Sequence, residues 1–406
     1  MRVVVTGMGV VSPIGIGTDQ FWTAAVNGVS GIKRIEGFDA STQRSQVAGQ
    51  VPAFNPSDFL SPKLLDQVDR FAQLALLASK LALDDAGGLD SYDPARVAVS
   101  IGSGMGGFGT FESSAIRKFK NQPIPPFTVP RTMANSAAAW VAIKHRFTGV
   151  NLTCSTACSS GANAIGMALD LLRSGRADVV VAGGAEACVL PLTMTSFEIL
   201  RALSTGFNTD PERASRPFAK GRDGFVMSEG AGILILEREE KAKQRGGRGY
   251  ACLAGFGQAC DAAHIVMPDM NGQVAAMRGA IVDAGLEPED IDHINAHATS
   301  TPLGDIVETR AVKSLFGERA KDIPISATKS LIGHSIGASA AMSSIATIMA
   351  LHTGTVHPTI NLDEADPECD LDYTPNHAQR KNPRTGLCNA FGFGGNNASI
   401  LFTTLE

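Results

Sequence analysis

The chain has 406 residues, of which 44% are hydrophobic and 18% charged, and this composition is typical of a globular protein with a large core. A formal net charge of −5 gives no general attraction to nucleic acid or to an anionic membrane. No run of about 20 apolar residues and no signal-peptide pattern are present, so we expect neither a membrane span nor secretion. The seven cysteines are scattered and odd in number, which predicts a reducing, cytoplasmic compartment and no disulfide framework.

The first part of the chain alternates predicted strands with predicted helices. The strand at 177–184 is continuously apolar, as in a strand buried on both faces of a parallel sheet. Further strands are predicted over 2–5, 96–101 and 232–237, and helices over 18–27, 66–86, 133–146 and 197–203. A charged stretch over 238–247 is a predicted hinge.

The second part resembles a degenerate repeat of the first. Strands are predicted over 290–297 and 323–327, helices over 273–284 and 333–351, and a glycine-rich turn between strands over 386–401. Alternating strands and helices in two similar parts predict a layered α/β fold. We therefore divide the chain into an N-terminal half, 1–245, and a C-terminal half, 246–406.

Cys158 occupies the most informative stretch, 151–163. This stretch begins polar and β-rich, ends in small residues and runs into a helical pattern. Cys158 is therefore predicted at a strand-to-helix turn, where unpaired N–H groups and the helix dipole lower a thiol pKa. The alternative is a buried cysteine that acts only as a small hydrophobic residue. The spacing of Cys154 and Cys158 is not that of a zinc motif.

Three further stretches carry groups suited to acyl transfer, and each follows or interrupts a predicted strand. They are His297–Asp305, Lys329–His334 and the glycine-rich Asn389–Asn397. Loops at strand ends are where α/β sheets place ligand sites. A thiolate can attack a thioester, histidines can move protons or donate hydrogen bonds, and exposed backbone N–H groups can hold an oxyanion. Taken alone, each histidine is more often structural.

Together these stretches resemble the type II β-ketoacyl-[acyl-carrier-protein] synthases of the thiolase superfamily, through nearly the whole chain. The resemblance rests on Thr156–Gly161, Ala182–Glu186, Arg201–Ser204, Arg222–Val226, Glu229–Gly232, His297–Asp305, Lys329–His334, Pro358–Leu362 and Phe391–Gly395. It implies the thiolase fold, five αβαβα layers built from two duplicated halves.

The resemblance also implies a catalytic set. Cys158 takes an acyl chain from acyl carrier protein as a thioester. His297 and His334 help to decarboxylate malonyl-acyl carrier protein and to stabilise the enolate, which attacks that thioester to give a β-ketoacyl product. The amides of Cys158 and Phe393 form the oxyanion hole, and Lys329 supports the histidines electrostatically.

Substrate contacts follow from the same resemblance. Thr299 and Thr301 hydrogen-bond the phosphopantetheine arm, which belongs to the carrier protein. Met105 lies at the acyl-pocket floor and Phe197 lies near it, while Phe391 and Phe393 lie on a gating loop. Arg201 faces the acidic carrier protein. We expect no metal and no cofactor on the chain itself.

Several positions depart from the family pattern. They are Asp66, Gln67, Ala219, Ser228, Val266, Met267, Ala298 and Ser343. Val266 and Met267 stand where Thr and Ser are frequent near the pantetheine, Ala298 where glycine is usual, and Ser343 where a glutamate often contacts the catalytic lysine. These departures question a housekeeping role in fatty-acid synthesis more than they question condensation.

Two alternatives stay open. A coenzyme A-dependent thiolase needs a second catalytic cysteine, and Cys388 lies before the Phe391 loop instead of at its reactive position. A non-catalytic chain-length factor typically lacks the nucleophile, whereas Cys158 is present. The sequence does not choose between fatty-acid and polyketide or polyene synthesis, nor between a homodimer and a heterodimer with a homologous subunit.

Overall fold

A computed structural model describes residues 1–52 and 54–405, so that residue 406, the last of the predicted C-terminal half, lies outside the description. Ten strands of the described residues are hydrogen-bonded side by side in one sheet, and they divide into two sets of five. The first set is, in order, β6 (Asn151–Leu152), β5 (Val97–Gly102), β7 (Val179–Ala187), β8 (Glu229–Arg238) and β1 (Val3–Ser12). The second is β11 (Ile325–Ser326), β10 (Ile294–Asn295), β14 (Thr385–Gly392), β15 (Asn396–Thr403) and β9 (Ala251–Cys260).

The two sets repeat one pairing pattern. In the first, β6, β5 and β7 are parallel, and β8 and β1 continue antiparallel. In the second, β11, β10 and β14 are parallel, and β15 and β9 continue antiparallel. Val3–Val5 of β1 pairs with 251–253 of β9 and joins the sets into one path. This repeated order agrees with the duplication expected from the sequence.

Helices fill the remaining layers. They are α1 (Thr18–Val26), α2 (Pro62–Leu65), α3 (Arg70–Asp85), α4 (Phe108–Phe119), α5 (Thr128–Thr132), α6 (Ser136–His145), α7 (Ser160–Arg173), α8 (Pro191–Ile199), α9 (Glu239–Gln244), α10 (Met270–Asp283), α11 (Gly304–Phe316), α12 (Lys329–Ile332) and α13 (Ser339–Thr353). Short strands add β2 (Gly15–Ile16) beside β1 and the pairs β3 (Ile32–Arg34) with β4 (Val47–Gly49) and β12 (Thr355–Val356) with β13 (Gln379–Arg380).

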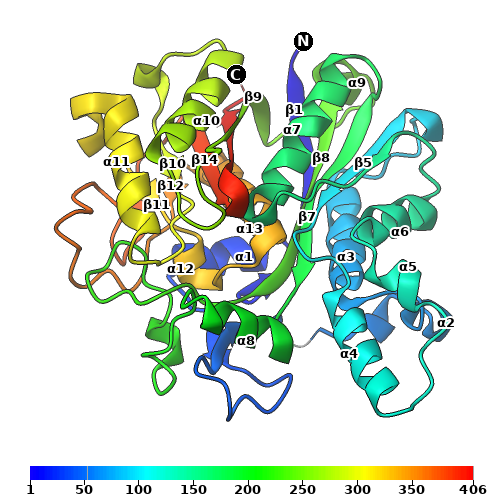
Figure 1. The fold of residues 1–406 in the computed structure, drawn as a ribbon. Helices are drawn as coiled ribbons and strands as arrows, with labels where there is room; N and C mark the ends of the chain where they lie inside the picture. Colours follow the sequence, from blue (N-terminus) through cyan, green and yellow to red (C-terminus); the bar gives the residue numbers. More distant parts are fainter. Residues whose placement is uncertain (53, 406) are drawn as a thin grey trace.

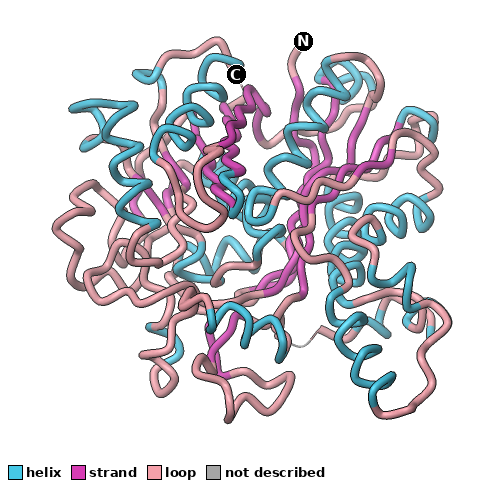
Figure 2. The backbone as a smooth tube through the Cα atoms, in the orientation of Figure 1, coloured by secondary structure: helices cyan, strands magenta, loops and turns pink. Residues whose placement is uncertain are grey.

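The layers are held by separate apolar cores. α7 and α13 lie in the middle and contact strands of both sets (Figure 1). α3 and α6 cover the outer face of the first set, and α10 and α11 cover that of the second, as the tube view also shows (Figure 2). The thiolase fold with αβαβα layers is confirmed. The turn before α7 contacts the turn before α13, so the fold brings the N-terminal ends of these two helices together.

One helical segment of the described residues, Ile336–Thr353, is long and apolar enough to cross a membrane, with a mean hydropathy of 1.3. It is 89% buried inside the protein. Nearly every residue of α13 packs against strands or against α7, so its apolar character reflects its central place in the fold.

Several predicted boundaries were wrong for local reasons. The helix predicted over 66–86 begins later, at Arg70, because the Asp69 side chain accepts a hydrogen bond from the Phe71 N–H and caps α3. The helix predicted over 197–203 starts earlier, at Pro191, and a left-handed residue, Arg201 (φ 55°), follows its end.

The sheet also differs from the simplest expectation. β7, predicted in a parallel sheet, is parallel to β5 but antiparallel to β8. The strand predicted over 290–297 is reduced to Ile294–Asn295. The residues that follow leave the sheet, which frees His297 and the loop after it to enter the site.

Candidate active site

Cys158 lies in a tight turn between β6 and α7. The turn is a single 3-10 turn, Ala157–Ser159, and Ala157 has a left-handed φ of 51°, a strained conformation for a residue with a side chain. The Ser160 hydroxyl braces the turn, because it accepts the Thr156 N–H at 2.9 Å and donates to the Ala157 carbonyl at 2.6 Å. Cys158 lines the cavity of the site from this turn.

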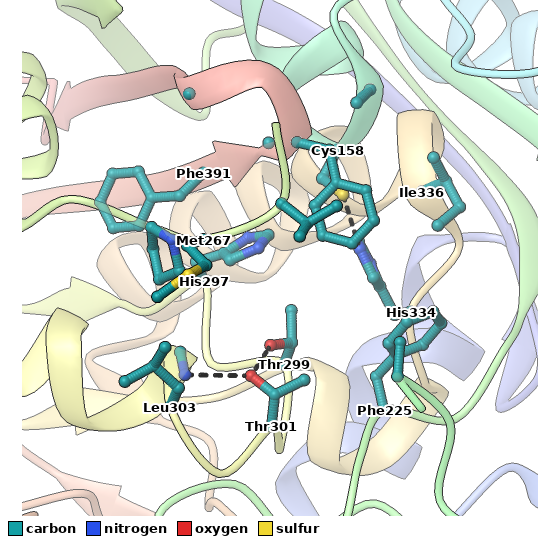
Figure 3. Close-up of a pocket in the computed structure, with 18 of the residues that line it drawn as sticks. Cys158, Phe225, Met267, His297, Thr299, Thr301, Leu303, His334, Ile336 and Phe391 are labelled. Carbon is teal, nitrogen blue, oxygen red and sulfur yellow. Dashed lines mark hydrogen bonds between the residues drawn. The ribbon is translucent and has the colours of Figure 1, made fainter. Parts of the chain in front are cut away.

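His334 is hydrogen-bonded to this sulfur. Its Nε2 lies 3.0 Å from the Cys158 Sγ (Figure 3). Its Nδ1 lies 2.9 Å from the Ser339 hydroxyl at the start of α13. The His334 N–H donates to the Val226 carbonyl at 2.7 Å. Backbone and side-chain contacts together therefore hold the imidazole against the nucleophile.

His297 completes the cluster from the opposite side. Its ring centre lies 5.5 Å from that of His334, at an interplanar angle of 89°. The ligand atoms of Cys158, His297 and His334 lie within 4.8 Å of one another. Such a separation would also allow the three groups to share a metal ion, so the expectation of no metal stays a prediction.

Glu308 positions the His297 backbone and was missed by the sequence reasoning. Its carboxylate accepts the N–H of His297 at 2.8 Å and that of Ala298 at 2.7 Å, and the Asn389 side chain donates to it at 3.2 Å. Ala298 has a left-handed φ of 39°, which explains why glycine is usual at this position. The one available signal was an acidic residue three positions after Asp305 on the same helix.

The loop after His297 is fixed by buried charges. The Arg222 guanidinium donates to the carbonyls of Thr301 at 3.0 Å and Pro302 at 2.7 Å. The Asp305 carboxylate accepts the Ser300 N–H at 3.1 Å. As a result the hydroxyls of Thr299 and Thr301 lie 3.1 Å apart, facing the cavity (Figure 3).

A third buried carboxylate, Glu186, connects two loops of the site by hydrogen bonds. It accepts hydrogen bonds from the N–H groups of Gly104, Met105 and Gly337 at 2.7, 3.2 and 3.1 Å. Burial raises its pKa to about 7. The sequence reasoning quoted Glu186 within a motif but assigned it no role, and the structure shows that it sets the position of Met105.

The pKa of Cys158 differs from the sequence expectation. Burial raises the pKa of this thiol to about 11, although the Lys329 charge and the N–H groups of Phe393 and Cys158 act in the lowering direction. The prediction that the helix N-terminus lowers the pKa of Cys158 was therefore wrong, because it omitted the cost of placing a thiolate in an enclosed cavity. Burial likewise places the pKa of His297 and His334 well below the usual range, so both imidazoles are neutral.

Lys329 stands behind the histidines as a buried cation. Its side chain is 2% exposed, and burial lowers its pKa while Cys388 and Glu308 act in the opposite direction. Within residues 1–52 and 54–405, no ion pair to Lys329 is found. Ser343, where a glutamate is common, has a buried hydroxyl without a partner among the same residues.

One cavity of about 520 Å³ joins these groups. Of the residues predicted for catalysis and substrate binding, all except Lys329 line it: Met105, Cys158, Phe197, Arg201, His297, Thr299, Thr301, His334, Phe391 and Phe393. Phe197 contacts Phe225 and Phe393 through its ring. The residue Phe225, which also meets His334 edge-on, was not predicted.

Comparison with known proteins agrees with this geometry. Residues 1–242 match the family "Beta-ketoacyl synthase, N-terminal domain", and residues 250–363 match "Beta-ketoacyl synthase, C-terminal domain". A 3-oxoacyl-[acyl-carrier-protein] synthase 2 from Synechocystis sp. is 43% identical over 99% of this chain and 97% of its own length. The enzyme of the same name from Coxiella burnetii is 41% identical over 99% and 98%.

Solved structures give the same result. The ishigamide ketosynthase/chain length factor superposes with a TM-score of 0.94 at 35% identity, over 100% of this chain and 99% of that one. A type II polyketide ketosynthase bound to its acyl-carrier protein gives 0.92 at 37% identity, with the same coverage. The matched domains, the full-length similarity and the fold together establish that the chain belongs to the β-ketoacyl synthase family.

Proposed function

We propose that this protein joins a Cys158-bound acyl chain to malonyl-acyl carrier protein by decarboxylative Claisen condensation, giving β-ketoacyl-acyl carrier protein. The observation that carries the proposal is the Cys158 sulfur, 3.0 Å from a neutral His334 imidazole inside a cavity shared with His297 and the Phe393 turn. This arrangement provides a nucleophile, a proton acceptor and hydrogen-bond donors for an oxyanion in one place.

In the loading step, the Cys158 sulfur attacks the thioester of an acyl carrier protein. Because burial holds the thiol pKa near 11, the proton leaves during the attack and passes to His334 Nε2. The amides of Cys158 and Phe393 hold the oxyanion. A carbon–sulfur bond to Cys158 forms, the bond to the carrier thiol breaks, and that thiol leaves with the proton.

In the condensation step, a malonyl carrier protein replaces the first. Thr299 and Thr301 hydrogen-bond its pantetheine arm, and His297 with His334 stabilises the enolate oxygen as carbon dioxide leaves. The enolate carbon attacks the Cys158 thioester, so that the new carbon–carbon bond forms and the carbon–sulfur bond to Cys158 breaks. The sulfur then takes up a proton from solvent, relayed by His334 Nε2. Lys329 supports this step by its charge. Phosphopantetheine belongs to the carrier protein, so the chain itself supplies no cofactor.

The thiolase alternative is not favoured by any observation. Cys388 lies within β14, fully buried, with its sulfur 3.9 Å from the Ala340 carbonyl. It does not line the cavity that holds Cys158. All seven cysteines are free, which supports our inference of a reducing, cytoplasmic location.

We propose an assembly of two similar subunits, either identical or with a homologous chain-length factor. Among the strands of the described residues, β6 is the last of the sheet and has a paired neighbour on one edge only. α6 contacts β6, α5 contacts α6 and α4 contacts α5. α4 and α5 expose large apolar side chains, among them Phe111 (54%), Phe119 (87%) and Val129 (69%). Similar solved proteins are described as a ketosynthase with its chain length factor. We retain 1–245 and 246–406 as the two halves, supported by the repeated strand order.

Two experiments test these proposals. Purified protein is incubated with acyl carrier proteins of graded chain length and carbon-13 malonyl-acyl carrier protein, and the products are identified by mass spectrometry. Wild type should give labelled β-ketoacyl product and Cys158→Ala none, and the preferred chain separates fatty-acid from polyketide or polyene use. No product with any chain would refute the function. Native mass spectrometry, alone and with a co-expressed homologue, decides the assembly.

A further inference from the structure

The mouth of the catalytic cavity is surrounded by exposed apolar side chains. Five residues both line the cavity and are well exposed: Leu200 (55%), Ile265 (69%), Val266 (38%), Met267 (53%) and Leu303 (43%). We call them the apolar collar. They come from three places in the fold, the end of α8, the loop after β9 and the turn before α11.

Hydrogen bonds fix the loop that carries three of the collar residues, Ile265, Val266 and Met267. His264 Nδ1 accepts the N–H groups of Val266 and Met267, both at 3.1 Å, and shapes that loop. The Ile265 carbonyl accepts the Gly394 N–H at 2.7 Å, which joins the loop to the Phe391–Gly395 turn. Met267 and Leu303 lie on the side of the cavity away from His334 and Ile336 (Figure 3).

Charge is scarce at this rim. Arg201 is the one exposed charged residue among those described as lining the cavity, because Glu308 is buried and Asp261 is half-buried and accepts the Asn397 amide. Apolar side chains gathered in this way around an opening mark a surface that another molecule covers.

The proposed chemistry identifies that molecule. A thioester that reaches Cys158 on a protein-bound arm brings the surface of its carrier against the rim. We infer that the carrier protein docks on the apolar collar mainly through its own apolar side chains, and that charge contributes little to its affinity. This inference rests on the proposed function, and it specifies a carrier whose attachment serine is surrounded by apolar residues.

The test compares two substrates that differ only in the carrier. One is an acyl-acyl carrier protein, and the other is the same acyl group on N-acetylcysteamine, which has the end of the arm and no protein. The collar variant is Ile265→Ser with Leu200→Ser. The matched control is Val282→Ser on α10, an exposed apolar position (68%) outside the cavity.

The collar variant should raise KM for the carrier-bound substrate about 10- to 30-fold, because interface apolar anchors typically each contribute several-fold to affinity. KM for the N-acetylcysteamine thioester should change less than about twofold, and the control should match wild type. Between 20 and 500 mM salt, wild-type KM for the carrier substrate should change less than about threefold.

Two results would overturn the inference. An equal rise in KM for both substrates would show that the collar contacts the arm and not the carrier. An unchanged KM in the collar variant, with a steep salt dependence in wild type, would assign docking to charge, including Arg201. If neither substrate acylates Cys158 in wild type, the proposed function itself fails, and this outcome is distinct from the other two.

Discussion

Replacing Lys329 with methionine should slow the reaction of Cys158 with iodoacetamide, because the lysine charge lowers the pKa of this thiol. At a pKa of about 11, roughly one thiol in a thousand is ionised at pH 8, against about a quarter for an ordinary thiol of pKa near 8.5. A nearby opposite charge shifts a pKa by about one unit or more. Its loss should therefore reduce the ionised fraction about tenfold at each pH.

The assay follows alkylation of the Cys158 peptide by mass spectrometry between pH 6.5 and 8.5. Exposed Cys260 in the same molecule is the internal reference for reagent concentration. In wild type the rate should rise about tenfold per pH unit without a plateau, since the group stays far below its pKa. A plateau near pH 7 would refute this reasoning, because it would show a thiolate already formed at rest, as the helix-start argument requires. An equal rate in Lys329→Met would refute the role of the lysine.

Three further predictions concern the histidines and metal. His297→Ala should lower the rate of malonyl decarboxylation about a hundred- to a thousandfold but leave acyl loading nearly intact, whereas His334→Ala should slow both steps. Single-turnover assays measure each step separately, and equal effects of the two variants would contradict this prediction. Burial lowers the pKa of His357 to about 4, so its unfolded form takes up a proton below pH 6.5 while the folded form does not, and folded-state stability falls on acidification. The destabilisation of His357→Asn, measured by urea unfolding, should accordingly be smaller at pH 5 than at pH 7 by about 2 kcal/mol; a constant difference would disprove the linkage. Chelators should leave condensation unchanged, while added zinc should inhibit through Cys158, His297 and His334, whose ligand atoms lie within 4.8 Å of one another; loss of activity on chelation would instead reveal a resident metal.

Much of the site could be predicted because its residues lie in local patterns. Cys158, His297 and the Phe391–Gly395 turn each follow a strand or interrupt two, and the fold places these loops around one cavity. The duplication could be predicted because similar strand and helix patterns follow one another in the two halves of the chain. The site loops and the strand order depend on hydrophobic periodicity and on the positions of strand ends, and short stretches of sequence are enough to predict both.

What could not be predicted depends on distant partners. Glu186 acts through backbone N–H groups of loops far away in sequence, those of Gly104 and Gly337, and no local pattern marks such contacts. The net pKa shift of Cys158 depends on how completely the cavity encloses it, which only tertiary packing decides. Helix ends were misplaced for a similar reason, since the cap at Asp69 competes with a helical pattern that continues through it.

The mass of the Cys158 peptide after exposure to acyl carrier protein tests the central claim most directly. Wild type is mixed with an acyl-acyl carrier protein, digested and analysed, with Cys158→Ala and Cys388→Ala treated in parallel. The acyl group should appear on the Cys158 peptide of wild type and of Cys388→Ala, and it should leave that peptide when malonyl-acyl carrier protein is added. Acylation that persists in Cys158→Ala, or that appears on any other cysteine in wild type, would contradict the assignment of Cys158 as the nucleophile.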